Sequence, residues 1–239
     1  MIKIKLFSIT LVVVMVLVSC KKLSAPVTPM ASLNLINVAV NLSAVKANFT
    51  NTGNKFNSQY YNLISTSVAY GTNYSYSVFA NQTVPLTIVS TADTTNPLYT
   101  ASLHFATASI YSLYLTGQTG ALDTIFVQES IPTYTDSLCG VRIINLNYNS
   151  KPIVVTQSAA PTTLDFQSLS YKQYSNFKVY GAHNSNASYV FQVRDAVTMT
   201  LLGAYTLSTP FFRNVTLAWI GQTGATGANA PKIIRINNY

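Results

Sequence analysis

From Ala31 onward, the chain consists mostly of short runs in which apolar and polar residues alternate. Residues 74–78 read Tyr-Ser-Tyr-Ser-Val, for example, and residues 215–219 read Val-Thr-Leu-Ala-Trp. A period of two is the side-chain period of a β-strand, and clusters of Gly, Pro, Asn and Asp separate these runs as turns do. In this part of the chain, no segment of helical length shows a convincing pattern of apolar residues at i, i+3 and i+4. The pattern therefore predicts an all-β protein.

The alternation also assigns many of the sixteen tyrosines to one face or the other of a strand. Tyr76, Tyr111 and Tyr180 fall in line with apolar neighbours, so we expect them in a hydrophobic core. Tyr114 lies on the opposite face of its strand from Tyr111. The pattern leaves Tyr114 and Tyr174 open as ligand contacts, because aromatic rings stack on sugar faces.

The motif GQTGA occurs at residues 117–121 and again 104 residues later, at 221–225. Two further pairs of segments match in the same order: 33–38 with 141–146, and 68–79 with 169–180. Small differences in offset are what loop insertions produce. The matches predict a tandem of two domains, residues 31–129 and 139–239, joined by a linker at 130–138.

About 100 residues with several short alternating strands is the size of an immunoglobulin-like β-sandwich. Each GQTGA is expected at the tip of the hairpin that joins the last two strands, where glycines adopt positive φ. A pair of such loops could also present a binding surface.

Each unit opens like "VRIINLN", continues like "YKQYSNFKVY" and closes with a strand ending in glycine, "TASIYSLYLTG" or "FRNVTLAWIG". In these segments the chain resembles domain-of-unknown-function family 4397, found in secreted proteins and lipoproteins of the Bacteroidota. The resemblance covers both repeats. It implies a fold and an extracytoplasmic setting but no active site. A tyrosine common in the family's closing strand matches Tyr111 and is replaced by Val215 in the second repeat.

The first nineteen residues have the form of a secretory signal, with Lys3 and Lys5 before an apolar core at residues 6–18. That core is shorter than the roughly 18–20 residues that a spanning helix needs. It ends in Leu-Val-Ser-Cys, which resembles the lipobox of bacterial lipoproteins, so Cys20 is predicted to be the lipidated first residue. Residues 20–30 then form a proline-containing tether. These features predict a protein anchored by lipid to the outer membrane, facing the periplasm or the cell surface.

Charge and cysteine content narrow the partners further. Only 8% of residues are charged, and the fourteen basic side chains form no run interleaved with aromatics, so nucleic acid is not an expected partner. With Cys20 acylated, Cys139 has no disulfide partner, and we expect it to be buried. The two histidines, His104 and His183, have no metal-ligand companions at local spacing, and His104 is expected on a solvated strand face. No cofactor or metal is predicted.

The sequence offers little material for catalysis and one signal for modification. It contains no nucleophile elbow, no phosphate-binding loop and no local pair of carboxylates. Three Asp-Thr or Asp-Ser pairs resemble the acceptor of Bacteroidota O-glycosylation, with Thr94, Thr124 and Ser137 as acceptors. The same pairs are common in turns, and both interpretations stay open.

The sequence therefore predicts a non-enzymatic, lipid-anchored envelope protein. Its ligand would be a glycan or another envelope protein. The alternative is a structural or assembly component of the outer membrane with no soluble ligand.

Overall fold

The computed structural model describes residues 28–49, 66–182, 188–208 and 213–238. The described chain is built almost entirely of β-strands, and its one helical element is a single 3-10 turn, η1 (Gly227–Asn229). Four sheets of four strands each account for all the strands. The predicted all-β class is confirmed.

The first repeat contains two of these sheets. Its strands are β1 (Met30–Asn37), β2 (Ala44–Asn48), β3 (Val68–Ala69), β4 (Thr72–Phe79), β5 (Thr83–Ser90), β6 (Pro97–His104), β7 (Ile110–Gln118) and β8 (Ala121–Gln128). One sheet has the order β4-β1-β7-β8 and the other β3-β2-β5-β6. They pack face to face over a core that includes Leu33, Ile88 and Phe105.

The second repeat has the same plan. Its strands are β9 (Leu138–Asn145), β10 (Ile153–Gln157), β11 (Ala160–Leu169), β12 (Lys178–Gly181), β13 (Ser188–Asp195), β14 (Leu201–Ser208), β15 (Asn214–Ile220) and β16 (Lys232–Asn237). The sheet orders β12-β9-β15-β16 and β11-β10-β13-β14 reproduce those of the first repeat strand for strand. The core of this repeat includes the predicted buried Cys139, together with Phe191 and Trp219.

Each repeat is thus an immunoglobulin-like sandwich with a distinctive strand order. The first strand lies in the middle of its sheet, where β1 pairs antiparallel with β4 and parallel with β7. In the second repeat, β9 makes the same two pairings with β12 and β15.

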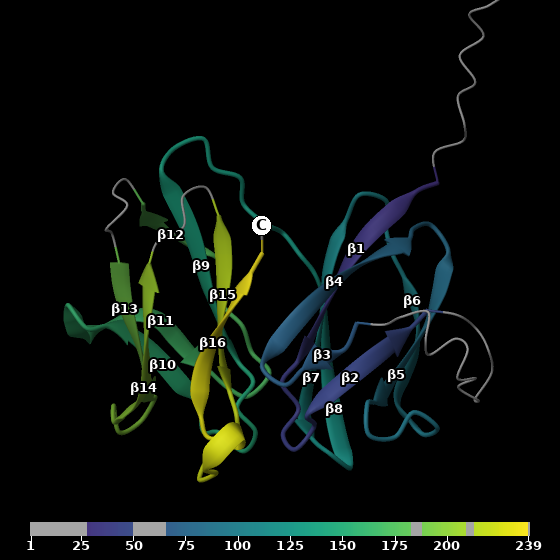
Figure 1. Ribbon diagram of the computed structural model, residues 1–239. Coiled ribbons are helices and arrows are strands. Elements are labelled where there is room, and N and C mark those ends of the chain that lie inside the picture. The colour runs from purple at the N-terminus through teal and green to yellow at the C-terminus, as the bar shows by residue number, and fades with distance from the viewer. Residues whose placement is uncertain (1–27, 50–65, 183–187, 209–212, 239) are drawn as a thin grey trace, which may run out of the picture.

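The two sandwiches pack against each other through a third apolar core, and Figure 1 shows them side by side. This core joins the sheet β4-β1-β7-β8 to the sheet β12-β9-β15-β16 and includes Ile36, Tyr114, Ile144 and Ala218. The four sheets therefore form a stack of four layers with three cores. The central strands of the two inner sheets are covered on both faces, and every residue of β15 is buried.

The structure confirms the predicted place of both GQTGA motifs. Gly117, Gly120, Gly221 and Gly224 all have positive φ, between 78° and 103°. In the first repeat, Gln118 pairs with Ala121, so the hairpin tip has two residues. In the second repeat the motif opens a longer loop, residues 221–231, before β16 begins.

In each repeat, a buried asparagine at the end of the first strand forms hydrogen bonds that hold the following segment in place. The Asn37 side-chain amide donates to the carbonyls of Leu42 and Val68. Asn145, 108 residues later, donates to Ser150 Oγ and to the Leu169 carbonyl. These bonds give the matched "IN" dipeptides of the two repeats a structural role.

Candidate functional site

A groove of about 360 Å³ lies at the boundary between the two repeats. We call it the inter-repeat groove, and its lining residues are Val127, Gln128, Ser130, Pro132, Arg142, Tyr174, Ser175, Asn176 and Phe177. The first four come from the end of β8 and the linker, and the others from β9 and the segment before β12. The volume is within the range of pockets that hold small ligands.

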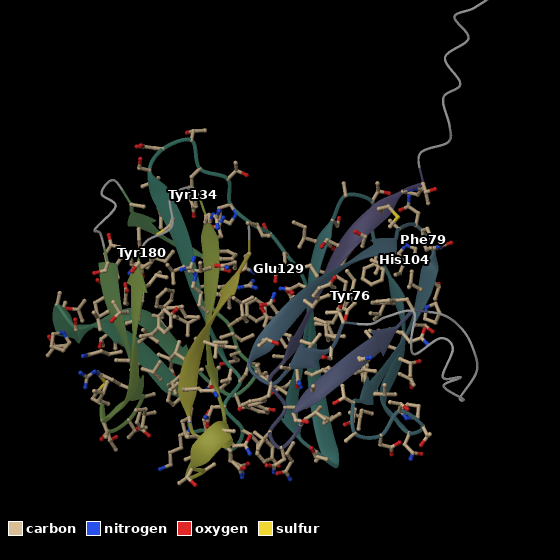
Figure 2. The ribbon with its side chains drawn as sticks, viewed as in Figure 1. Tyr76, Phe79, His104, Glu129, Tyr134 and Tyr180 are labelled. Atoms are coloured by element: carbon tan, nitrogen blue, oxygen red, sulfur yellow. The ribbon has the colours of Figure 1, made fainter. Side chains whose placement is uncertain are left out.

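Beneath the groove lies an ion pair that joins the two repeats. The Arg142 guanidinium donates through Nη2 to Glu129 Oε1 at 2.6 Å, and the side chains of Arg142 and Glu129 are only 5% and 1% exposed. Glu129 follows β8, and Figure 2 shows it between the two sandwiches. Because the two charges compensate each other, the floor of the groove carries no net charge.

Further hydrogen bonds hold the guanidinium in place. Arg142 Nη2 also donates to the Tyr114 hydroxyl at 3.0 Å, and Nε donates to Thr216 Oγ1 at 2.8 Å. Burial alone would lower the pKa of Arg142, but Tyr114 and Glu129 outweigh it, so the net pKa is raised and the guanidinium stays charged. Three hydrogen bonds thus fix the orientation of the guanidinium.

Two aromatic rings cover the guanidinium from the groove side. The Arg142 guanidinium carbon lies 4.9 Å from the Phe177 ring centroid and 5.6 Å from that of Tyr174. These are cation–π distances. Tyr174 is 43% exposed, so it can contact a ligand as the sequence analysis proposed.

Tyr114, the other tyrosine proposed for ligand contact, has a different role. Its side chain is 0% exposed and belongs to the core between the repeats. The prediction that Tyr114 could contact a ligand is therefore wrong. The face of β7 that carries Tyr114 is covered by the second repeat. Burial raises the pKa of its hydroxyl, with the positive charge of Arg142 opposing this effect.

The remaining tyrosine assignments and His104 agree with the sequence analysis. Tyr76, Tyr111 and Tyr180 are buried at 8%, 5% and 6% exposure. His104 is exposed at the end of β6, as Figure 2 shows. Cys20 and His183 lie outside the described residues.

The three proposed acceptor residues lie apart from one another and are all half-buried. Thr94 is in the loop between β5 and β6, Thr124 is on β8, and Ser137 precedes β9. Asp93 accepts the N–H groups of Thr95 and Asn96, as turn-forming aspartates do. Asp123 and Asp136 each accept the N–H group of the acceptor residue that follows them. Glycosylation at these positions remains a prediction.

Sequence reasoning did not identify the Arg142–Glu129 pair. The available signal was a lone arginine inside the apolar run "VRIINL", since a charge in a buried strand requires a partner. Its partner is thirteen residues earlier, beyond the linker, and no local motif connects the two.

The lining of the groove contains groups that can recognise a ligand by ring contact and hydrogen bonds. It combines two aromatic rings with amide, hydroxyl and guanidinium groups that donate or accept hydrogen bonds. In the described ranges, no group of three or more His, Cys, Asp or Glu residues is placed to hold a metal ion. Likewise, none of the helical structure in those ranges is long and apolar enough to cross a membrane.

No family model matches the chain, and no curated protein matches it either.

Proposed function

We propose that this chain is a non-enzymatic, lipid-anchored protein of the bacterial outer membrane that binds a glycan or protein ligand in the inter-repeat groove. The observation that carries the proposal is the exposed ring of Tyr174 beside polar side chains, above a charge-neutral floor. Sites of this kind hold an apolar face by ring contact and fix its orientation by a few polar groups.

A glycan suits this lining best. The Tyr174 ring can stack on the C–H face of a sugar, while Gln128 and Asn176 have amides that both donate to and accept from hydroxyl groups. The positive charge of Arg142 in the lining is already balanced by Glu129. The groove therefore needs no counter-charge from its ligand, and a neutral polyol can fill it.

The anchoring part of the proposal rests on the sequence alone. The lipobox-like residues 17–20, the proline-containing tether and the resemblance to domain-of-unknown-function family 4397 support it. The intact mass of the protein purified from membranes measures it. A mass equal to the chain from Cys20 plus lipid supports the anchor, and additional hexose-sized increments would support glycosylation at Thr94, Thr124 or Ser137.

Glycan-array binding by the purified protein tests the ligand. We expect Tyr174→Ala to weaken binding roughly tenfold or more, as the loss of an aromatic anchor does. Tyr74→Ala is the matched control, because Tyr74 is 42% exposed on β4 and does not line the groove. Equal effects of the two substitutions would place the ligand elsewhere.

If the protein binds none of the polysaccharides or host glycans on the array, the ligand is not a carbohydrate. Cross-linking in intact cells then separates the two remaining functions. Capture of an envelope protein that depends on Tyr174 would indicate a protein ligand in the groove. Capture that is independent of Tyr174 would favour the structural or assembly role.

A further inference from the structure

The second repeat differs from the first at the GQTGA loop. The loop of residues 221–231 replaces a two-residue tip, and Asn229 in it hydrogen-bonds to Asn41 of the first repeat. On its other side, this loop forms the wall of a second cavity. The loop lies at the end of the molecule opposite the start of β1 (Figure 1).

This second cavity has a volume of about 420 Å³, and we call it the Trp219 cavity. Its lining residues are Asn149, Ser150, Lys151, Asp195, Leu202, Trp219, Thr223, Gly224 and Pro231. None of them lines the inter-repeat groove. Its volume is also within the range of small-ligand pockets.

Trp219, Leu202 and Pro231 give this cavity an apolar lining. Trp219 packs so closely over Gly203 that a Cβ at Gly203 would lie 2.8 Å from its ring. In the first repeat, 104 residues earlier, Leu115 takes the place of Trp219 and Tyr99 takes the place of Gly203. The aromatic side chain is therefore on β6 in the first repeat and on β15 in the second. A register shift between Val193 and Arg194 disrupts the pairing of β13 with β14 beside Leu202, which is 44% exposed.

The polar part of the lining contains one charge of each sign. Lys151 and Asp195 take part in none of the salt bridges among the described residues. Asp195 Oδ1 accepts the N–H groups of Val197 and Thr198, each at 2.9 Å. The pKa of Asp195 is lowered mainly by these N–H groups and further by the positive charge of Lys151, and both residues line the cavity.

We infer that the Trp219 cavity binds a small zwitterion with an apolar body, the chemistry of a free apolar amino acid. The carboxylate of the ligand pairs with Lys151, its ammonium group pairs with Asp195, and its apolar body packs on Trp219, Leu202 and Pro231. Charge-assisted hydrogen bonds of this kind are the stronger ones in proteins. The inference does not depend on the proposed ligand of the groove.

Fluorescence tests the inference directly, because Trp219 is the only tryptophan in the chain. Titration with L-leucine is expected to change its emission in a saturable way, with the same affinity by calorimetry. Isoamylamine lacks the carboxylate and 4-methylpentanoate lacks the ammonium group. Each is expected to bind about tenfold or more weakly.

Thr223→Phe, which fills the cavity from the loop, is expected to abolish the change. Thr119→Phe is the matched control, since Thr119 holds the same position in the first GQTGA and is exposed. The inference is overturned if L-leucine leaves the emission unchanged, or if both analogues bind as tightly as leucine. A saturable response to glucose alone would assign the cavity to a saccharide instead. None of these outcomes bears on the Tyr174 comparison, which tests the groove.

Discussion

The buried pair of Arg142 and Glu129 links the two repeats through single side chains. Removing two charges from water is costly, and mutual attraction together with further hydrogen bonds offsets that cost. Here Tyr114 and Thr216 supply those bonds to Arg142, while Glu129 Oε2 is sealed from solvent with no partner among the described groups. Breaking the pair from either side would therefore leave an uncompensated charge.

We accordingly expect Arg142→Met and Glu129→Leu each to lower the free energy of unfolding by about 3–5 kcal/mol. The double variant should cost less than the sum, because it leaves no unpaired charge. Urea denaturation of the four proteins measures this cycle. Lys172→Met is the control, since it breaks the more exposed pair with Asp123 and should cost no more than about 1 kcal/mol. Strict additivity of the two core substitutions would contradict the coupling.

Buried tyrosines make stability sensitive to alkaline pH. Burial raises the pKa of Tyr76 to about 12 and also raises the pKa of Tyr70, Tyr171 and Tyr180. The folded protein thus keeps protons that the unfolded chain releases near pH 10. Stability should be complete below about pH 10 and should fall as the pH rises towards 12. The test is to measure the free energy of unfolding across this pH range and to follow tyrosine ionisation by tyrosinate absorbance. A constant free energy of unfolding would contradict the prediction.

At the scale of single residues, the sequence predicts what one strand can show. Tyr76, Tyr111 and Tyr180 share a face with apolar neighbours, and all three are buried. Tyr114 shares a face with Ser112 and Thr116, a pattern typical of a solvated surface, yet all three are buried. From the sequence alone, a polar strand face that packs on another domain looks the same as one that faces water, because side chains with hydroxyl groups occur on both.

At the scale of elements, turn chemistry is the most predictable part of this chain. Asn41 and Asn149, 108 residues apart, both have a φ of 62° and follow the first strand of their repeats. The glycines of both motifs adopt positive φ as predicted. The length of the second loop was not predictable from the motif, because the residues that decide it, 226–231, lie beyond the matched segment.

The glycines of each motif should differ in their tolerance of alanine. A Cβ at Gly117 would collide with the Ala121 carbonyl oxygen, and one at Gly221 would lie 2.6 Å from that of Ala230. A Cβ at Gly120 or Gly224 meets nothing within 4 Å. We expect Gly120→Ala and Gly224→Ala to cost about 1–2 kcal/mol, the strain of positive φ alone. Gly117→Ala and Gly221→Ala should cost clearly more in thermal denaturation. Four equal values would contradict the collision.

At the scale of the whole molecule, the two repeats are not independent domains in a row, because they share a core between their inner sheets. The internal matches identify the two repeats, but the mutual packing of their inner sheets leaves no local sequence signal. Ile36, Ile144 and Ala218 belong to strands that would be apolar in a separate sandwich as well. For the same reason, the groove and its ion pair could not be predicted, since they exist only where the two repeats meet.

The shared core predicts that the two repeats unfold as one unit. Trp219 emission reports on the second repeat only, whereas circular dichroism reports on both, and the two urea curves should coincide. Ala218→Asp places a carboxylate in the core between the repeats, where Ala218 is fully buried, and should separate the curves. Ala204→Asp, at an exposed position on β14, is the matched control and should leave them together. Separate transitions in the unmodified protein would mean that the third core does not couple the repeats, and the inter-repeat groove would then lack the rigid frame that a preorganised site requires.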